Sequence, residues 1–167
     1  VYCVLEEGYW GRDHGNDEGI PPDGFERTLA GIFPAGGAYD DASFGGLGAG
    51  DGQGGAGITP IVANSWMHFM NAEVAVMTGG DPTSETLAGI RSHMNKVDDI
   101  PGAPAMDQAA IDNYIANFTA EWTAASSLDA KLELWAEEFF ITQRGNGIDA
   151  YNSYRRNGYP KNLQPMV

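Results

Sequence analysis

Residues 59–80 read TPIVANSWMHFMNAEVAVMTGG. Thr59 and Pro60 suit the N-cap and first turn of an α-helix, and Gly79-Gly80 suits its end. Between them, large apolar side chains recur every three or four positions, which is the spacing of one helical face. The expected apolar face consists of Val62, Trp66, Phe69, Met70, Val74 and Met77. This segment therefore predicts an amphipathic helix.

Four further helices are predicted downstream, each bounded by turn or capping residues. They run from Asp81-Pro82 to near Ile100-Pro101-Gly102, from about Pro104 to Ala125, from Ser126-Ser127 to Gly145, and over Ile148–Arg156 before Gly158-Tyr159-Pro160. Each of the first three has its own apolar stripe: Leu87, Ile90, Met94 and Val97; then Ile111, Tyr114, Ile115, Phe118 and Trp122; then Leu128, Leu132, Trp135, Phe139 and Thr142.

Short connections predict how these helices pair. The first and second helices should form one antiparallel hairpin, and the third and fourth another. Two successive hairpins are typical of a tetratricopeptide-like stack, although no 34-residue period is visible. We therefore expect a mainly α-helical fold, and residues 59–167 form its helical part.

Residues 1–58 have a different composition, rich in Gly, Pro and Asp. Eight of the thirteen residues from Gly45 to Gly57 are glycine. No sustained apolar period is present, and clusters such as Pro21-Pro22-Asp23-Gly24 favour turns. We expect a long irregular Gly/Pro-rich loop region that belongs to the same domain as the helices.

The chain is strongly acidic, with 23 Asp and Glu against 9 Lys and Arg, for a net charge of −14. This balance argues against nucleic-acid binding and against adsorption on an anionic membrane, because both need clustered basic residues. An ordinary solvated acidic surface also explains the charge. Cys3 is the only cysteine, so an internal disulfide is impossible. No apolar run is long enough for a transmembrane helix, and no signal peptide is visible; a targeting segment of an exported protein would lie upstream.

Motifs for chemistry are scarce. No Gly-Lys-Ser/Thr accompanies the Gly-rich stretch, which argues against a phosphate-binding loop. The three histidines, His14, His68 and His93, are not at zinc-ligand spacing. Asp40, Asp41 and Asp51 could bind calcium, but their spacing is not that of an EF-hand. Glu137 and Glu138 are adjacent on a helix and diverge by about 100°, which is poor geometry for a glycosidase pair. The sequence therefore predicts no catalytic residue, no cofactor and no metal site.

Aromatic side chains in the loop region are candidates for ligand binding. Rings on loops can stack on sugar faces while polar neighbours hydrogen-bond hydroxyl groups. Equally, the same rings could anchor the loop onto the helices. The candidate ligand-binding residues are Tyr9, Trp10, Arg12, Asp13, His14, Tyr39 and Asp40.

The last forty residues carry a family resemblance. Residues 134–143 (LWAEEFFITQ), Asn146-Gly147 and residues 149–160 (DAYNSYRRNGYP) resemble the closing signature of SusD/RagB-family proteins. Three further stretches resemble family motifs: residues 63–73, the helix that usually reads Leu-x-x-Ala-Glu, and loop motifs at 11–16 with 21–23 and at 33–40. The chain departs from the usual letters at Asp149, Tyr151 and Asn157, which leaves the inferred ligand open.

The resemblance implies the C-terminal portion of a lipid-anchored nutrient-binding protein on the outer-membrane surface. Such a protein has no enzymatic activity and covers a SusC-like TonB-dependent transporter, to which it delivers a glycan or a peptide. The lipid anchor would lie upstream of this chain. The fold implied is a set of tetratricopeptide-like helices that carry ligand-binding loops.

The closing motif residues Arg155, Arg156, Tyr159 and Pro160 are expected to be structural. Arginine side chains in the last turn of a helix suit its dipole and can pair with carboxylates. We expect at least one of the two arginines to contact an acid such as Glu137 or Glu138.

Two other functions fit the sequence. A helical-repeat adaptor for another protein would use the helices and leave the loop aromatics buried. A glycoside hydrolase fragment would need two carboxylates about 5–10 Å apart in a cleft.

Overall fold

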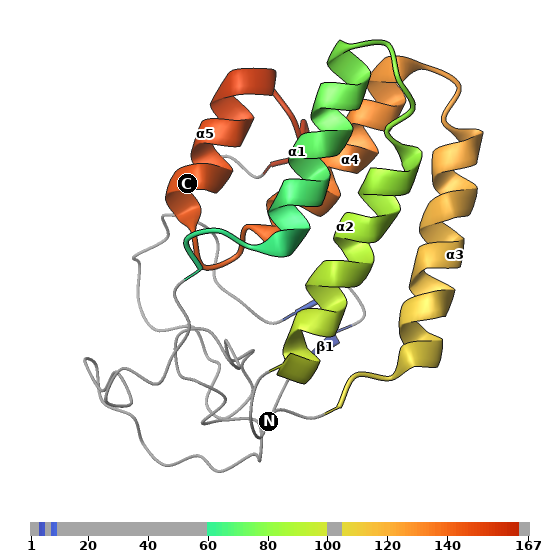
Figure 1. The fold of residues 1–167 in the computed structure, drawn as a ribbon, viewed down its shortest axis with the longest axis vertical. Coiled ribbons are helices and arrows are strands. Elements are labelled where there is room, and N and C mark those ends of the chain that lie inside the picture. The colour runs from blue at the N-terminus through green and yellow to red at the C-terminus, as the bar shows by residue number, and fades with distance from the viewer. Residues whose placement is uncertain (1–3, 6–7, 10–59, 100–104, 164–167) are drawn as a thin grey trace. The chain divides into compact units, whose positions relative to one another are not determined.

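The computed structural model describes residues 4–5, 8–9, 60–99 and 105–163 (Figure 1). The chain forms two compact units, Val1–Thr59 with Asn162–Val167, and Pro60–Lys161. In the first unit, β1 (Val4–Leu5) and β2 (Gly8–Tyr9) pair antiparallel, with Val4 opposite Tyr9.

The second unit is helical. Its elements are α1 (Asn64–Met77), α2 (Thr83–Asn95), the 3₁₀-helix η2 (Lys96–Asp99), α3 (Gln108–Ala124), α4 (Leu128–Thr142) and α5 (Gly147–Asn157). The described part of the chain is therefore mainly α-helical, which confirms the predicted fold class at that level.

Polar side chains cap the first turns of three helices. Asp107 accepts a hydrogen bond from the Ala109 amide at the start of α3, and Ser127 accepts one from Ala130 at the start of α4. Asn146 does the same for α5 by accepting from the Asp149 amide. These caps place the α4 and α5 boundaries close to the predicted ones. Helix α3, however, begins at Gln108 rather than near Pro104, because Asp107 supplies its cap.

The predicted start of the first helix was wrong. Helix α1 begins at Asn64, after Ala63, and not at Thr59-Pro60. The carbonyl of Pro60 accepts a hydrogen bond from the Asn146 side chain at 3.2 Å, so it is used by the α4–α5 turn and not by a first helical turn. The predicted end was correct, since Gly79 follows with a left-handed φ of 77°, a conformation that glycine adopts readily.

Helices α1 and α2 form the predicted antiparallel hairpin. They lie side by side and are joined by residues 78–82 (Figure 1). The Asp81 carboxylate closes the turn by accepting from the Thr83 amide at 3.0 Å and from its hydroxyl at 2.6 Å. These bonds hold the pKa of Asp81 below its ordinary value.

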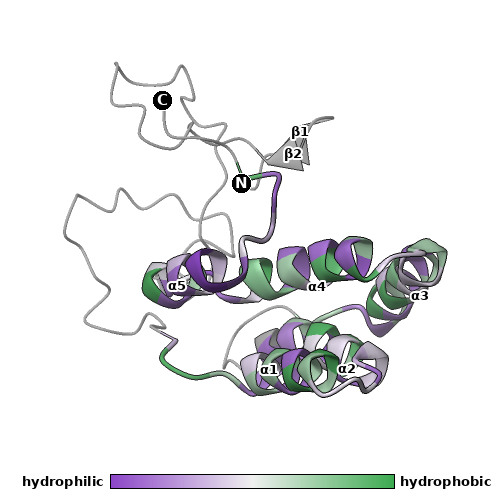
Figure 2. Cartoon of the chain, turned by 90° about the horizontal axis from the view of Figure 1, so that it is seen from above, coloured by the Kyte–Doolittle hydropathy of each residue, from purple (hydrophilic) through white to green (hydrophobic). Residues whose placement is uncertain are grey.

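The predicted second hairpin is not closely packed. Helix α3 packs against α2, whereas α4 crosses both α1 and α2. In the view of Figure 2, α1 and α2 lie side by side, and α5, α4 and α3 follow one another in a second row above them. Because α3 and α4 each pack on the α1–α2 hairpin, their own backbones stay apart.

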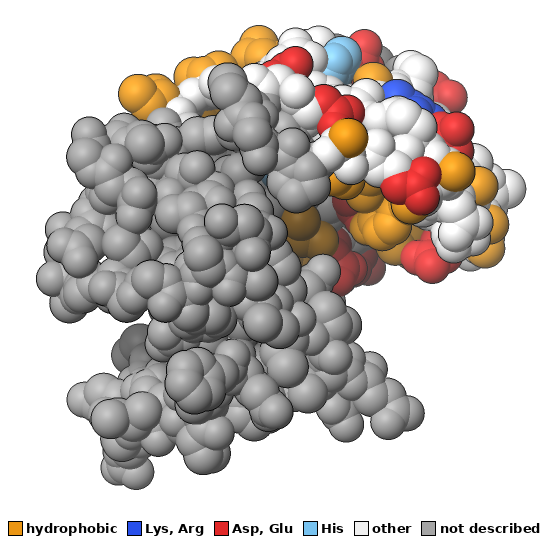
Figure 3. Space-filling model, turned by 90° about the horizontal axis from the view of Figure 1, so that it is seen from below, with side chains coloured by type: hydrophobic (Ala, Val, Ile, Leu, Met, Phe, Trp, Pro, Cys, Tyr) orange, Lys and Arg blue, Asp and Glu red, His pale blue; other side chains and the backbone are white. Residues whose placement is uncertain are grey.

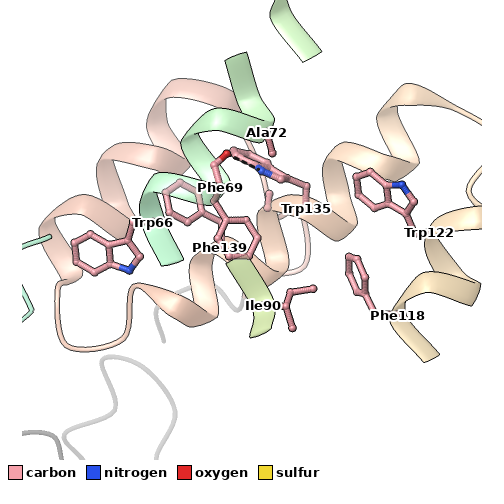
Figure 4. Close-up of a cluster of buried hydrophobic side chains, with 9 residues drawn as sticks. Trp66, Phe69, Ala72, Ile90, Phe118, Trp122, Trp135 and Phe139 are labelled. Atoms are coloured by element: carbon pink, nitrogen blue, oxygen red, sulfur yellow. Dashed lines mark hydrogen bonds between the residues drawn. The ribbon is translucent and has the colours of Figure 1, made fainter. Parts of the chain in front are cut away.

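The hydrophobic core lies where four helices meet (Figure 4). Phe69 of α1 stacks on Phe139 of α4 with ring centroids 5.3 Å apart, and Trp135 tilts against Phe139 at 5.4 Å. Such aromatic pairs contribute beyond the area that they bury. The buried cluster comprises Trp66, Phe69, Ala72, Ile90, Phe118, Trp122, Trp135, Ala136 and Phe139.

Buried tryptophans also join the helices through hydrogen bonds. The Trp66 indole of α1 donates to the Thr142 carbonyl at 2.9 Å, and Trp135 of α4 donates to the Phe69 carbonyl at 3.1 Å. Trp122 of α3 donates to the Thr83 hydroxyl at 2.9 Å. Because an unpaired buried N–H is costly, each bond fixes which side of one helix meets the next.

The predicted apolar face of α1 is corrected by the structure. Trp66 and Phe69 are buried as expected, and Ala72 and Ser65 join them. The other predicted members, together with Met67, are exposed: Val62 by 71%, Met67 by 47%, Met70 by 40%, Val74 by 56% and Met77 by 80%. Apolar side chains occur on every side of α1, so more than one of its faces fits the periodicity of a buried face. The indole hydrogen bonds of Trp66 and Trp135 determine which face is buried.

The surface of the helical unit mixes acidic and apolar side chains. On the face seen in Figure 3, the two kinds lie next to each other, with few basic side chains between them. Within the described part of the chain, no helix combines the length and apolar character needed to cross a membrane.

Candidate functional site

A pocket lies between α3 and α4, where the two backbones stay apart. Its volume is about 340 Å³. Four residues of each helix line it at i, i+3, i+4 and i+7 spacing, which is one face of each helix. These residues are Tyr114, Asn117, Phe118 and Glu121 of α3, and Leu134, Glu137, Glu138 and Ile141 of α4. We call it the α3–α4 pocket.

A short hydrogen bond spans the pocket. The Tyr114 hydroxyl donates to Oε1 of Glu138 at 2.5 Å. Burial, followed by the hydrogen bond to Glu138, raises the pKa of Tyr114 above its ordinary value. The phenol therefore stays protonated at neutral pH and acts as a donor. This side-chain bond connects two helices whose backbones do not pack closely.

Glu138 is the most buried acid of the pocket, with 8% of its surface exposed. Burial raises the pKa of its carboxyl group, the Tyr114 hydrogen bond opposes that rise, and Glu137 and Glu121 add to it. Loss of hydration disfavours the charged form, while a donor favours it. Any group that brought a further donor or a positive charge would stabilise the ionised form.

The remaining lining combines acidic and apolar side chains from both helices. Glu121 and Glu137 add two carboxylates, and none of the described lining residues is basic. Phe118, Leu134 and Ile141 form the apolar part. Among the described residues, no group of three or more His, Cys, Asp or Glu side chains is arranged to hold a metal ion. The described lining thus offers negative charge, hydrogen-bonding groups and apolar surface.

The ligand-binding residues predicted from the sequence lie outside this site. Tyr9 is in β2, where only its backbone pairing is described. The other six candidates, Trp10, Arg12, Asp13, His14, Tyr39 and Asp40, fall outside the described residues. Their proposed role stays a prediction.

The closing motif lies against other parts of the helical unit. Arg156 donates to Glu73 of α1 at 2.6 Å, and the Arg155 guanidinium lies 5.7 Å from the Tyr151 ring. Glu137 and Glu138, which we expected as the carboxylate partners, line the α3–α4 pocket instead. The expected contact between one of the two arginines and an acid is therefore confirmed, but the acid is Glu73 rather than Glu137 or Glu138, because this side of α4 faces α3.

Tyr159 and Pro160 extend these contacts onto α4. Tyr159 donates a short hydrogen bond to Asp129, and Lys161 pairs with the same carboxylate at 2.9 Å. Pro160 is buried, and Gly158 ends α5 in a left-handed conformation with φ of 75°. The motif thus fastens α5 and the residues after it to α1 and α4.

Sequence reasoning missed the α3–α4 pocket. Tyr114 was assigned to the apolar stripe of the third helix, yet it is 40% exposed and bonds to Glu138. One signal was available: a tyrosine hydroxyl on an apolar stripe needs a polar partner. The partner itself lies 24 positions away, and local periodicity does not identify it.

In comparisons with protein-family models, with curated proteins and with solved structures, the chain has no match.

Proposed function

We propose that this chain is the C-terminal helical part of a SusD/RagB-type nutrient-binding protein. In this role it captures a glycan or a peptide at the outer-membrane surface without catalysis. It passes the ligand to a SusC-like TonB-dependent transporter, and a lipid anchor upstream of this chain holds it at the membrane. The tetratricopeptide-like stacking of its hairpins is part of the same proposal.

The observation that carries this proposal is the closing segment, residues 149–160. Its sequence resembles the family signature, and several of its side chains make contacts that explain why those residue types are needed at those positions. Arg156 pairs with Glu73, Tyr159 bonds to Asp129, and Pro160 is buried. These contacts attach α5 and the residues after it to helices that are distant in the sequence. Several residues of the motif therefore contribute to the packing of the helical unit.

Two further features support the proposal. The α1–α2 hairpin is the kind of unit that stacks in tetratricopeptide-like folds. The α3–α4 pocket gives the helical part a recess of side-chain size, which is the usual form of a small-ligand site. A receptor of this kind needs binding groups and no catalytic constellation.

The test is an affinity pull-down of the tagged full-length protein from native outer membranes in mild detergent, with mass spectrometric identification of the partners. The expected result is a stoichiometric TonB-dependent β-barrel protein. A soluble partner would instead favour a helical adaptor, and the absence of any stoichiometric partner would reject transporter delivery.

The adaptor is a second candidate because of an exposed apolar stripe on α1. Met67, Met70, Val74 and Met77 are all at least 40% exposed and follow 3-4-3 spacing, which suits packing against another helix. Replacing Met70 and Val74 together with serine should abolish capture of an adaptor partner. The same double variant should still capture a transporter if the transporter binds to a surface other than this stripe on α1.

The hydrolase alternative has a testable requirement. Burial raises the pKa of Glu138, as a general acid needs, and other carboxylates line the same pocket. Turnover of any glycan in a panel, abolished by Glu138→Gln, would establish hydrolysis. Binding without turnover agrees with the receptor.

A further inference from the structure

We propose that the α3–α4 pocket binds an ammonium or guanidinium group carried on an aliphatic chain, as in the lysine or arginine side chain of a peptide. This inference rests on the proposed function, since the ligand would be the captured nutrient. It selects a basic peptide over a neutral glycan.

The first step of the argument is the charge of the pocket. Three carboxylates, those of Glu121, Glu137 and Glu138, line a recess of about 340 Å³, and no described lining residue is basic. Like charges that share a partly desolvated recess repel one another, and a bound cation relieves that repulsion. The pocket is therefore complementary to a positive group.

The second step is the hydrogen bonding of Glu138. This carboxylate is 8% exposed, and its Oε1 atom accepts from Tyr114. Within the described part of the chain, its Oε2 atom has no donor. An ammonium or guanidinium group offers several N–H donors for charge-assisted bonds to such an oxygen. The most buried acid of the pocket thus has room for a donor from a ligand.

The third step is the apolar part of the pocket lining. Phe118, Leu134 and Ile141 lie on the same recess as the carboxylates. Lysine and arginine side chains combine a methylene stem with a charged head, and the stem packs on apolar surface while the head reaches polar partners. The lining matches both parts of such a side chain.

Two other ligand classes fit less well. Sugar recognition combines an exposed aromatic face with free hydrogen-bonding groups. Phe118 is only 6% exposed, and Tyr114, which is 40% exposed, already uses its hydroxyl to bond to Glu138. A metal ion needs its carboxylates to converge on one point, and no such group is found among the described residues. A cation of extended shape can use carboxylates that are spread along a recess.

The experiment is isothermal titration calorimetry on the complete chain at pH 7 and low salt. The probes are acetyl-Ala-Lys-Ala-amide, the same peptide with norleucine in place of lysine, and maltotriose. Norleucine keeps the aliphatic stem and removes the ammonium group. We expect the lysine peptide to bind, the norleucine peptide to bind at least about tenfold more weakly, and maltotriose not to bind. Binding of the lysine peptide should weaken as sodium chloride is added.

Three variants locate the site. Glu138→Gln keeps the acceptor for Tyr114 but removes the charge, and should weaken lysine-peptide binding by about tenfold or more. Glu121→Gln, at an exposed acid, should weaken it by about two- to fivefold. Asp99→Asn removes one exposed acid outside the pocket and should leave binding unchanged. Far-UV circular dichroism checks that each variant is folded. Because Glu121 is exposed, Glu121→Gln is expected to fold like the natural protein.

Several outcomes would overturn the inference. Equal binding of the lysine and norleucine peptides would show that charge is irrelevant, and preferential binding of maltotriose would point to a glycan. Unchanged affinity in both Glu121→Gln and Glu138→Gln would place the ligand elsewhere, and failure of the lysine peptide to bind would reject it outright. If the pull-down still recovers a transporter in that case, the proposed function stands and only the ligand class fails.

Discussion

His93 is a titratable side chain that is held largely away from water on α2. Burial, and to a smaller extent the nearby charge of Lys96, lowers the pKa of His93 from 6.5 to about 4. Its Nδ1 atom is buried and has no hydrogen-bond partner among the residues that the structure describes. The folded protein therefore keeps this imidazole neutral at pH values where the unfolded chain would protonate it.

This difference makes the free energy of unfolding depend on pH. The unfolded state binds more protons than the folded state between pH 6.5 and about 4, so stability is full above pH 6.5 and falls as the pH drops through this range. The titration of His93 lowers the free energy of unfolding by at most about 3 kcal/mol. Replacing His93 with Gln removes the titration. We expect the stability of the natural protein relative to His93→Gln to fall between pH 7 and pH 4.5, as measured by urea unfolding at both values. A constant difference would contradict the prediction.

At the scale of secondary-structure elements, the α1–α2 hairpin depends on a close approach at Gly89. A Cβ atom added there would lie 2.7 Å from Cε2 and 2.8 Å from Cδ2 of Phe69. Phe69 is itself fully buried and stacked on Phe139, so its ring has little freedom to move. Glycine at this position thus sets the distance between the two helices.

We expect Gly89→Ala to destabilise the protein by about 1–2 kcal/mol. Overpacking of a core costs about 1–3 kcal/mol, and the better helix propensity of alanine offsets up to about 1 kcal/mol of it. Gly147→Ala is the matched control, because a Cβ at Gly147 meets nothing within 4 Å, and its stability should be unchanged or slightly higher. Chemical denaturation of both variants tests the pair, and equal stabilities would show that the contact with Phe69 relaxes freely.

The hairpin also shows how far the sequence could predict the elements. Capping residues and glycines gave the helices and most of their ends, because these signals act within a few residues. The buried face of α1 was only partly predicted, since Met67, Met70, Val74 and Met77 are as apolar as the residues that are buried. The choice between faces depends on Gly89 and on the Trp135 hydrogen bond to Phe69. Both contacts are remote in sequence.

The candidate site depends on the same kind of long-range information. Glu137 and Glu138 were noticed from the sequence as adjacent acids, but nothing local indicated that they face Tyr114 across a gap. That gap exists because α3 packs on α2 while α4 crosses the hairpin. A pocket between two helices that each pack on a third element is a property of tertiary structure, and periodicity within one helix cannot reveal it.

At the scale of the whole molecule, the net charge of −14 has a thermodynamic effect. Excess charge of one sign repels itself more strongly in the compact state than in the extended chain. Within the described residues, three pairs join an Arg or Lys side chain to a carboxylate, and each of these pairs has at least one exposed member. Such pairs contribute little each, so they do not cancel the repulsion.

We therefore expect added salt to stabilise the protein. Raising sodium chloride from about 20 to 200 mM shortens the screening length to below about 10 Å and should increase the melting temperature by about 2–4 °C, which corresponds to about 1 kcal/mol. Differential scanning calorimetry measures the change. Potassium chloride at equal concentration should have the same effect, because screening depends on ionic strength. A melting temperature that falls with salt would mean that attractive pairs outweigh the repulsion.

The three described tryptophans have an optical consequence. Each of Trp66, Trp122 and Trp135 is at most 3% exposed, and its indole N–H donates a hydrogen bond to an oxygen atom in another helix. Indole fluorescence shifts to longer wavelength when water reaches the ring. Variants in which Trp10 is replaced and only one of the three is kept would thus report separately on the contact of α1 with α4 and of α3 with α2. The chain therefore has intrinsic fluorescent probes at its helix–helix interfaces. They allow the order in which these interfaces separate during unfolding to be followed without an added label.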